Sequence, residues 1–385
     1  MSVQPLPFFD QDHAALRERA RKWVKENVFP ERGGDRTVEG QALQRARDLG
    51  VDGVLQYTVP RQFGGVRDVV QARDLCILRE ELARGDALTD TMFAMQALGS
   101  QPIALAGSEA QKRHYLPAVA RGSAIAAFAI TEPEAGSDVA AMQTRALRQG
   151  DDFSITGAKC FISNAGIADF YVVFASTEPE KKSRSVSAFV VPRDARGLEI
   201  KEKTALLSPH PIGAIEFENC FVTKDALLGQ LGEGLRIAFA TLDLLRCSVG
   251  AAAAGLAQRA LDEAVAYSKA RHQFGRAIAE FQGIEFKLAE MKTELEAARL
   301  LVYQAAWAHD CAGADAKARS SMAKLYATEA AQRIVDQALQ IHGASGLVAG
   351  SIMERLYRDV RALRIYEGTS EIQKVIIARD LLKKA

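Results

Sequence analysis

The spacing of the hydrophobic residues changes twice along this chain of 385 residues, and the two changes restrict the folds open to it. From residue 12 to about 122 the spacing is helical, as in the run from Leu16 to Val24, where apolar residues recur every three or four positions between charged ones. Between residues 126 and 222, four segments rich in β-branched and aromatic residues are separated by Gly, Pro, Asn and charged turns, which predicts strands at 153–163, 168–176, 185–192 and 214–222. The helical pattern then returns and continues to the end of the sequence. This order of helices, strands and helices predicts a multidomain α+β fold.

The same pattern divides the chain into three expected domains. A helical domain covers residues 1–122, a small β domain covers 123–234, and a second helical domain covers 235–385. A chain of this length is expected to hold two or three structural units. The long amphipathic helices of the third domain suggest an antiparallel bundle whose exposed apolar stripes also pair subunits.

Composition excludes several classes of partner. The formal net charge is +1, and the basic and acidic residues are interspersed, so no basic face exists for nucleic acid or for an anionic membrane surface. No apolar run approaches the ~18 residues that a membrane span needs, and the Ala-rich segment 248–260 is interpreted as a packed helix. Residues 1–24 include Asp10 and Asp12 and lack the apolar stretch of a secretory signal, so we expect a cytoplasmic protein.

The cysteines do not form a recognisable framework. They are odd in number and far apart, at positions 76, 160, 220, 247 and 311. This spacing argues against both a set of disulfides and a clustered zinc site. We therefore expect small buried side chains.

Three other patterns resemble functional motifs but are interpreted as chance. His309, Asp310 and Cys311 are adjacent, so on a helix they point in different directions, and we expect no metal site. Ser321 and Lys324 match the hydrolase spacing S-x-x-K without its companion motifs. The stretch "GQLGEGL" lacks the G-x-G-x-x-G order of a dinucleotide-binding loop.

Two segments offer groups that suit a polar or aromatic ligand. "FAITEPEAGSD", residues 128–138, ends an apolar run with hydroxyl and backbone N–H groups that suit a ring edge or a phosphate, although alone it also fits a strand running into a loop. "RHQFGRAIAEFQ", residues 271–282, combines Arg271, Phe274 and Gln282 near a glycine break, and so offers a cation, an aromatic face and an amide. On composition alone, the second segment is a solvated helix corner.

A third segment, "RIYEGTSEIQ" at residues 364–373, places a carboxylate directly before a Gly-Thr pair typical of a helix start. The carboxylate is Glu367. Its negative charge either interacts favourably with the helix dipole or serves as a general base. The segment alone leaves both interpretations open.

Together these segments resemble the acyl-CoA dehydrogenase family of flavoproteins. "ITEPEAGSD", "GAKCFISNA", "RHQFGRAIAEFQ", "QIHGASG" and "IYEGTSEIQ" appear in the family's order and spacing, over essentially the whole chain. The resemblance implies an N-terminal helical domain, a middle β-barrel domain and a C-terminal four-helix bundle. It also implies that FAD binds between domains and subunits, and that the enzyme removes two hydrogens from the α and β carbons of an acyl-CoA thioester.

The resemblance also implies a set of cofactor-binding residues. Phe128, Ile130, Thr131, Phe161 and Ser163 would lie against the flavin ring. Arg271 and Phe274 of a neighbouring subunit would meet the pyrophosphate and adenine portions, and such sharing implies an oligomer, usually a homotetramer in this family. The full set expected to bind FAD is Phe128, Ile130, Thr131, Gly136, Ser137, Phe161, Ser163, Arg271, Phe274, Gln282, Gln340, Gly343, Thr369 and Glu371.

In the family's reaction the base at the position of Glu367 takes the α proton while flavin N5 accepts the β hydrogen as hydride. Desolvation by the bound substrate would raise the pKa of this carboxylate toward the operating pH. Its backbone N–H would contact the thioester oxygen, Gly368 would permit the close approach, and Thr369 would cap the next helix. Some relatives carry the base at the position of Leu245, which cannot accept a proton, and this strengthens the assignment of Glu367.

The residues expected to contact the substrate are Ser137, Asp243, Arg246 and Gly368. Asp243 is equally interpreted as a buried structural partner of Arg246. Asp90 falls on the helix that lines the acyl pocket in relatives, but its polar Thr-Asp-Thr surroundings favour a solvent-facing side chain.

Several alternatives remain at this point. The expected activity is α,β-dehydrogenation of an acyl-CoA, with electrons passed to an acceptor such as an electron-transferring flavoprotein. The same chemistry on a carrier-protein-bound acyl group, an acyl-CoA oxidase, and a catalytically idle homologue acting as a scaffold are the alternatives. Chain length and branching of the acyl group do not follow from the sequence.

Overall fold

The structure is a computed structural model that describes residues 7–28, 37–178, 180, 185–312 and 316–384. The chain divides into two compact units. Unit 1 contains Met1–Glu31, Gln71–Asp90 and Asp243–Ala385, and unit 2 contains Arg32–Val70 and Thr91–Leu242. Helices α4 (Ala87–Ala106) and α6 (Gly234–Ala270) contribute residues to both units. The boundaries of the three domains expected from the sequence stay a prediction.

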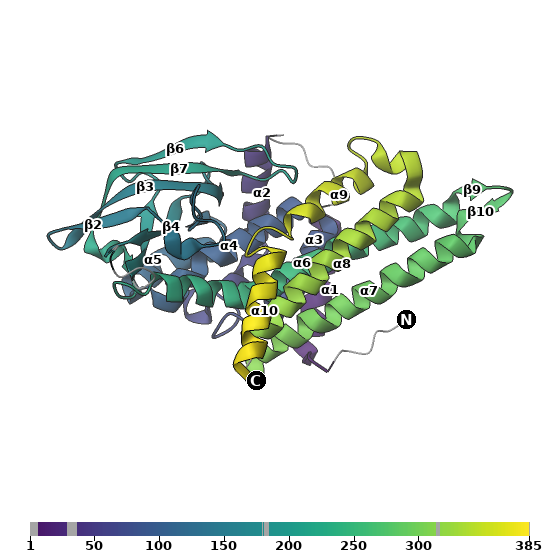
Figure 1. Ribbon diagram of the computed structural model, residues 1–385, viewed down its shortest axis with the longest axis horizontal. Coiled ribbons are helices and arrows are strands. Elements are labelled where there is room, and N and C mark those ends of the chain that lie inside the picture. The colour runs from purple at the N-terminus through teal and green to yellow at the C-terminus, as the bar shows by residue number, and fades with distance from the viewer. Residues whose placement is uncertain (1–6, 29–36, 179, 181–184, 313–315, 385) are drawn as a thin grey trace. The chain divides into compact units, whose positions relative to one another are not determined.

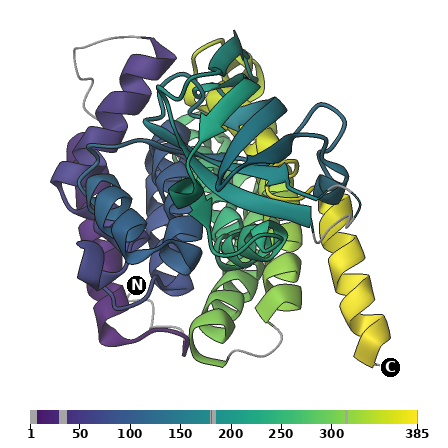
Figure 2. The same ribbon diagram turned by 90° about the vertical axis from the view of Figure 1, so that its left-hand side faces the viewer.

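Unit 2 is built around an eight-stranded sheet, shown in Figure 1. The strands lie in the order β6-β7-β3-β2-β4-β5-β8, and β1 pairs in parallel with β4. Figure 2 shows the strands, in teal, turned relative to one another as in a twisted sheet. In chain order the strands are β1 (Ala126–Ala129), β2 (Arg145–Gln149), β3 (Asp152–Ser163), β4 (Phe170–Ser176), β5 (Val186–Pro192), β6 (Leu198–Lys203), β7 (Ile212–Val222) and β8 (Leu227–Leu228).

The four strand segments expected from the sequence correspond to β3, β4, β5 and β7. Of the other four, β1 overlaps the segment that the sequence allowed as a strand running into a loop, whereas β2, β6 and β8 were not expected, because they lack the pattern of a half-buried strand. β1 and β8 are very short, while β2 and β6 are mostly exposed and carry charged side chains.

The helices of unit 2 hold β1 in position. Helix α2 (Val38–Val51) and helix α5 (Glu109–Ala120) belong to this unit, together with most of α4. On α4, the amide of Gln96 donates to the Ala124 oxygen at 2.7 Å and accepts from the Ala126 N–H at 2.8 Å. A Cβ atom on Gly99 would lie 2.5 Å from the Ala126 Cβ, so α4 approaches β1 at a distance that only glycine permits.

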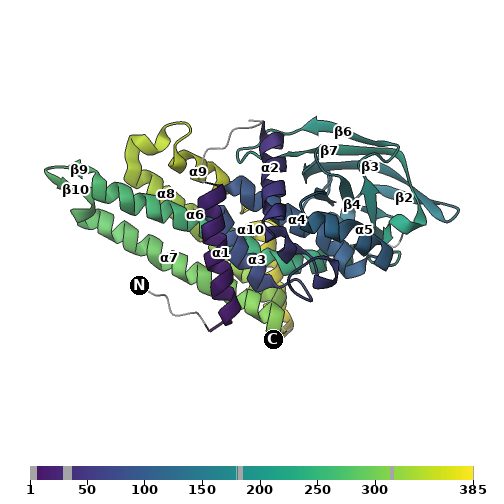
Figure 3. The same cartoon turned by 180° about the vertical axis from the view of Figure 1, so that it is seen from behind.

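Unit 1 is helical, and its long helices are seen from behind in Figure 3. A hairpin of β9 (His272–Gln273) and β10 (Arg276–Ala277) joins α6 to α7 (Gln282–Trp307), as Figures 1 and 3 show. Helix α7 packs along α8 (Ala316–His342). Helices α9 (Ile352–Ala362) and α10 (Ser370–Lys384), the latter coloured yellow in Figure 2, also pack on α8. Unit 1 also contains α1 (Gln11–Asn27) and α3 (Ala72–Gly85).

The expectation that no segment approaches membrane length was wrong for α6. An apolar window of this helix has a mean hydropathy of 1.5, so by length and composition alone it could cross a membrane. However, 78% of that window is buried inside the structure, as in the core helix of a globular protein. A Cβ on Gly250 would lie 2.8 Å from Val302 Cγ2, and one on Gly255 would lie 2.1 Å from the Glu80 oxygen. These close approaches support the expected packed helix.

Other local predictions have mixed outcomes. The expected inward face of α1, from Leu16 to Val24, is buried. Cys76, Cys220 and Cys247 are buried as expected, but Cys160 is half-buried and Cys311 is exposed, because it lies in a short π-helical turn, Ala308–Ala312, that follows α7.

Candidate active site

Glu367 lies in the loop directly before α10, with its backbone in the left-handed region at φ +53°. Its Oε2 atom is buried and has no hydrogen-bond partner in the part of the chain that the structure describes. A buried polar atom without a partner costs about 1–3 kcal/mol, so folded proteins rarely keep one without a function. Glu367 therefore presents a proton acceptor that no neighbouring group occupies.

Charged side chains from four helices surround the Glu367 carboxylate within unit 1. Burial raises the pKa of Glu367, and the guanidinium of Arg79, the ammonium of Lys324 and the guanidinium of Arg246 partly oppose this increase. Asp90 adds to it. The net result is a carboxylate whose pKa is above its ordinary value, which is the direction that a general base at neutral pH requires.

Arg79 and Asp90 form a buried ion pair in this cluster. Arg79 donates from Nε and Nη2 to the two carboxylate oxygens of Asp90, both at 2.9 Å, and from Nη1 to Ser248 Oγ at 3.0 Å. Asp90 is 4% exposed, so the expectation that it faces solvent was wrong. Its polar neighbours in the sequence suggested solvent, but a bidentate guanidinium from α3 compensates the buried charge.

The carbonyl groups of the Glu367 loop are held by two side chains. Lys324 Nζ donates to the Tyr366 oxygen at 2.6 Å and also to the Gly368 oxygen. Gln373 Nε2 donates to the Glu367 oxygen at 3.3 Å and to the Gly368 oxygen at 2.8 Å. The conformation that carries Glu367 is thus fixed on both sides.

The helix cap expected at Thr369 is confirmed by the geometry of this loop, whereas the expected approach of Gly368 to the substrate stays a prediction. Gly368 has φ +89°, and a Cβ there would lie 2.7 Å from Gln373 Nε2, so the position requires glycine. Thr369 Oγ1 accepts from the Ile372 N–H at 3.3 Å and caps α10, as expected. Glu371 is exposed in the first turn of α10.

Asp243 and Arg246 form an ion pair on α6, one turn apart. Arg246 is 5% exposed, and its Nε atom is buried without a partner in the described part of the chain. The pairing agrees with the structural interpretation of Asp243. Leu245, the alternative position of the base in relatives, is buried.

The residues expected to face the flavin ring lie together in unit 2. The Cys160 N–H donates to the Thr131 oxygen at 3.0 Å, which places the segment after β1 beside the end of β3. Phe128 and Ile130 are buried beneath the surface, whereas the Phe161 side chain is 60% exposed with φ +52°. Ser163 Oγ lies 3.0 Å from His210 Nε2. An exposed aromatic ring with neighbouring hydroxyl-bearing residues fits a planar ring system with polar edges, such as a flavin.

The loop that carries Gly136 and Ser137 is exposed and open. A Cβ on Gly136 would meet no atom within 4 Å. The start of the loop is fixed by Glu132, which accepts from Lys159 Nζ at 2.7 Å and from the Gln143 N–H at 2.6 Å. Ser137 is therefore presented to solvent from an anchored segment.

The hairpin between α6 and α7 presents a second exposed group. Phe274 is 94% exposed with φ +52°, and its ring meets the edge of Phe281 at 6.1 Å between centroids. The Arg276 guanidinium lies 4.1 Å from the centroid of the Phe281 ring. Arg271 and Gln282 are exposed at the two ends of this hairpin.

Gln340 and Gly343 lie at the same end of the bundle as this hairpin, because Tyr267 near the end of α6 stacks on His342 at 4.4 Å. Gln340 is sixteen residues beyond Lys324 on α8, which corresponds to about 24 Å along the helix. The structure therefore brings the unit 1 residues together in two separate groups. The hairpin group lies away from Glu367 of its own chain, as an expected contribution to a neighbouring subunit's cofactor requires.

Backbone strain marks three of the predicted residues. Among the described residues, five that are not glycine have positive φ: Phe161, Asn164, Asn219, Phe274 and Glu367. Asparagine tolerates this region, whereas a bulky side chain there costs about 1–3 kcal/mol and persists only where surrounding structure enforces it. All three residues other than asparagine were predicted from the sequence as cofactor-binding or catalytic.

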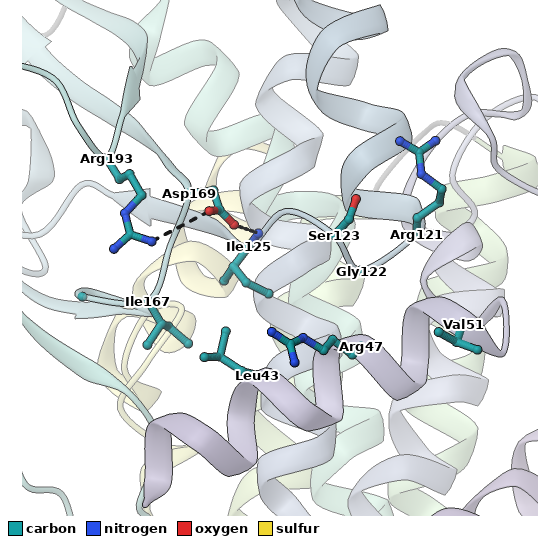
Figure 4. A pocket seen from close by; sticks show the side chains of 11 residues that line it. Leu43, Arg47, Val51, Arg121, Gly122, Ser123, Ile125, Ile167, Asp169 and Arg193 are labelled. Atoms are coloured by element: carbon teal, nitrogen blue, oxygen red, sulfur yellow. Dashed lines mark hydrogen bonds and ion pairs between the residues drawn. The ribbon is translucent and has the colours of Figure 1, made fainter. Parts of the chain in front are cut away.

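Unit 2 also contains a cavity of about 670 Å³ that none of the predicted site residues lines (Figure 4). Asp169 accepts from the Ile125 N–H at 2.7 Å and pairs with Arg193 at 3.9 Å on one side of it. Arg47 from α2 and Arg121 line other parts of the cavity (Figure 4). The carboxylate among its lining residues, Asp169, already interacts with the Ile125 N–H and with Arg193.

Sequence reasoning missed two residues that contact the Glu367 loop. Lys324 had been set aside with Ser321 as a chance match, and Arg79 was not considered. Lys324 lies on the buried stripe of α8 with Thr328, Ala331 and Val335, and it is 1% exposed. A lysine at helical spacing within an apolar stripe was the signal that could have identified it, because lysine is rarely buried without a specific partner.

Comparison with known proteins places this chain in a family. Residues 10–123 match the acyl-CoA dehydrogenase N-terminal domain, residues 127–220 the middle domain, and residues 232–382 the C-terminal domain. The chain belongs to the acyl-CoA dehydrogenase family. It is an oxidoreductase that acts on acyl-CoA, and the predicted family and fold class are confirmed.

Two relatives illustrate the range of this family. A 3-(aryl)acrylate reductase of Clostridium sporogenes is 40% identical over 381 residues, which cover 98% of this chain and 100% of the relative. The mitochondrial short-chain specific acyl-CoA dehydrogenase of Rattus norvegicus is 37% identical over 376 residues, which cover 97% of this chain and 90% of the relative.

Three solved structures share the fold. The structure described as the electron transferring flavoprotein of Acidaminococcus fermentans has a TM-score of 0.91 and 33% identity, covering 100% of both chains. Butyryl-CoA dehydrogenase from Megasphaera elsdenii has a TM-score of 0.89 and 32% identity, covering 99% of this chain and 100% of its own. PigA with FAD and proline has a TM-score of 0.90 and 30% identity, covering 100% of both chains. These relationships support FAD as the cofactor, as expected from the sequence.

Proposed function

We propose that the protein dehydrogenates an acyl-CoA to the trans-2-enoyl-CoA, with Glu367 as the base that removes the α proton. The observation that carries this proposal is the buried, unpartnered Oε2 of Glu367, which lies among three cations in a loop whose backbone is strained. A carboxylate with a raised pKa that no neighbour satisfies is suited to accept a proton from a weak carbon acid.

FAD, when bound, supplies the acceptor for the β hydrogen, which leaves as hydride. Phe161, Thr131 and Ser163 would hold its ring system. Glu367 receives the α proton and becomes a neutral carboxylic acid, and the electron pair of the α C–H bond forms the new double bond. The Glu367 N–H makes no hydrogen bond within the described residues, so it is free to donate to the thioester oxygen as negative charge develops there.

The same site supports reduction as a second candidate activity. The Clostridium sporogenes relative, at 40% identity, is named as a 3-(aryl)acrylate reductase. In that direction a protonated Glu367 would deliver the α proton to an unsaturated acyl group. The alternatives of a carrier-protein-bound substrate and of an oxidase use the same residues.

The deciding experiment is an anaerobic titration of the flavin spectrum with a panel of acyl-CoAs. Bleaching by at least one saturated acyl-CoA is the expected result. Protein whose flavin has been reduced with dithionite is then mixed anaerobically with enoyl and arylacryloyl thioesters. Recovery of the oxidised spectrum only with the unsaturated compounds, and no bleaching in the first step, would favour the reductase. A protein that binds FAD and responds in neither direction would refute the proposal.

The remaining expectations belong to the same proposal. A separate electron-transferring flavoprotein is the proposed acceptor, and rapid re-oxidation of the bleached protein by air would instead indicate an oxidase. A homotetramer in the cytoplasm is the proposed state. The exposed hairpin group lies away from Glu367 of its own chain, which supports an assembly in which the hairpin reaches a neighbouring subunit. Sedimentation of the purified protein tests the assembly.

A further inference from the structure

Lys324 makes an unusual set of contacts for a buried lysine. It is 1% exposed on α8, yet in the described part of the chain no carboxylate hydrogen-bonds to its ammonium. Instead it donates to the Tyr366 and Gly368 oxygens, which belong to the residues on either side of Glu367. Burying an ammonium group is energetically unfavourable, and packing alone does not compensate it. The position of Lys324 next to this loop therefore suggests a functional role.

The first consequence of these contacts is geometric. The Tyr366 C=O and the Glu367 N–H belong to one planar trans peptide and point in opposite directions. By holding the Tyr366 oxygen, Lys324 fixes the direction in which the Glu367 N–H points. That N–H has no partner of its own in the described residues and is the proposed donor to the thioester oxygen.

The second consequence is electrostatic. The charged groups that face Glu367 are Arg79 from α3, Asp90 from α4, Arg246 from α6 and Lys324 from α8. Burial lowers the pKa of Lys324 to about 8, with Glu367 opposing and Arg246 adding to that decrease. Lys324 is therefore mainly protonated at neutral pH, and its charge favours the ionised form of Glu367.

We infer that Lys324 is a positioning residue for the reaction, which orients the N–H donor of Glu367 through the Tyr366 carbonyl and places a positive charge beside the Glu367 carboxylate. This inference rests on the proposed role of Glu367 as the base. The geometric effect and the electrostatic effect can be tested separately. Gln373 also donates to carbonyl oxygens of this loop, those of Glu367 and Gly368, but it carries no charge.

Four variants test the inference. Lys324→Met removes the hydrogen bonds and the charge, Lys324→Gln keeps a donor but no charge, and Gln373→Leu removes backbone contacts without a change in charge. Lys287→Met is the matched control, because Lys287 also reaches an oxygen on another helix, that of Gln337, but lies outside the Glu367 loop. FAD content and melting temperature are measured for each.

The rate of anaerobic flavin bleaching is measured against pH with the best acyl-CoA for the parent protein. In both Lys324 variants the acid limb of kcat/KM should move to higher pH by about one unit or more, because a facing positive charge is lost. The rate on the alkaline side of that limb should fall ~10²-fold in Lys324→Met and less in Lys324→Gln, since misplacement of a donor by about 1 Å has effects of this size. Gln373→Leu should slow bleaching without moving the limb, and Lys287→Met should do neither.

An unshifted acid limb in Lys324→Gln, with parental FAD content, overturns the electrostatic half of the inference. A parental rate above the limb in Lys324→Met overturns the geometric half. If Lys324→Met does not fold, Lys324→Gln and Gln373→Leu decide both halves between them. The proposed function fails separately, when the parent protein itself is not bleached or when Glu367→Gln bleaches at the parental rate.

Discussion

The carboxylate of Glu367 has a buried oxygen and must still be able to hold a negative charge, and its charged neighbours explain how. Burial raises its pKa, while Arg79, Lys324 and Arg246 limit the increase. Replacing any of these groups should move the pH at which the base ionises. The direction of each expected pKa shift follows from the charge that is removed.

Glu367→Gln keeps the size of the side chain and the backbone N–H but removes the proton acceptor. We expect FAD content and acyl-CoA binding to be retained, while bleaching slows by the ~10²–10⁴-fold typical of a general base. Stopped-flow absorbance of the flavin measures the rate. Glu290→Gln, an exposed carboxylate on α7 outside the predicted site, is the matched control and should bleach at the parental rate. Parental bleaching in Glu367→Gln would rule out this residue as the base.

Asp90→Asn removes the negative charge from the buried pair and leaves Arg79 uncompensated. Asp90 raises the pKa of Glu367, so its neutralisation should move the acid limb of kcat/KM to lower pH, opposite to the change expected for Lys324. Breaking a buried ion pair should also reduce the free energy of unfolding by about 3–5 kcal/mol. Urea unfolding and the pH profile measure the two effects, with the exposed Asp336→Asn as control. A shift of the limb to higher pH would contradict the placement of Asp90 beside the base.

At the scale of elements, the hairpin between α6 and α7 is built to present side chains outward. Phe274 adopts a strained backbone at its tip, and Arg276 and Phe281 pack behind it. None of these contacts requires Arg271, whose side chain is exposed where α6 ends. The hairpin therefore keeps its shape when Arg271 is changed.

Arg271→Ala should weaken FAD retention while the chemical step in the loaded protein stays unchanged. A lost charged hydrogen bond to the cofactor's phosphates corresponds to about 1.5–3 kcal/mol, or roughly tenfold to more than a hundredfold in the dissociation constant. Ultrafiltration followed by flavin absorbance measures retention, and added FAD should restore activity. Lys269→Ala, an exposed cation at the end of the same helix, is the control. Equal FAD affinity in Arg271→Ala and the parent would show that the hairpin does not reach the cofactor.

Across the whole molecule, the periodicity of apolar residues predicted the order of helices and strands and the four longer strands with clear patterning. It failed for β2 and β6, because their exposed, charged side chains carry no core-facing pattern. Motif spacing pointed to Glu367, Phe161 and Phe274, whose backbones the structure shows at positive φ and whose proposed roles are tied to short segments. It missed Arg79 and Lys324, because these residues approach the loop before α10 only in the folded chain, where α3 and α8 pack near that loop. No local sequence pattern predicts this contact.

Within unit 1, a buried cluster of polar and charged side chains joins α1, α3 and α7, and it should make the stability of this unit depend on acid pH. Glu80 on α3 accepts from Arg299 at 2.8 Å, and it also pairs with Arg17 at 3.2 Å and with the Tyr303 hydroxyl. Burial alone would raise the pKa of Glu80, but Arg299 and Arg17 override it and lower this pKa from 4.5 to about 2. The ionised Glu80 carboxylate therefore contributes its full stabilisation above pH 4.5, and this contribution is lost as the pH falls from 4.5 toward 2. The contribution amounts to about 3 kcal/mol of the free energy of unfolding.

Glu80→Gln should remove this pH dependence. Across this acid window, the parent protein should take up one more proton on unfolding than the variant does. For each unit by which the pH is lowered, the free energy of unfolding should therefore fall by about 1.4 kcal/mol more in the parent than in Glu80→Gln. Urea titrations between pH 5 and pH 2.5 measure the slope, which lies within the window set by the two pKa values. Glu290→Gln, an exposed carboxylate on α7, should keep the parental slope. The same slope in Glu80→Gln as in the parent would mean that the cluster joining the three helices does not hold Glu80 ionised.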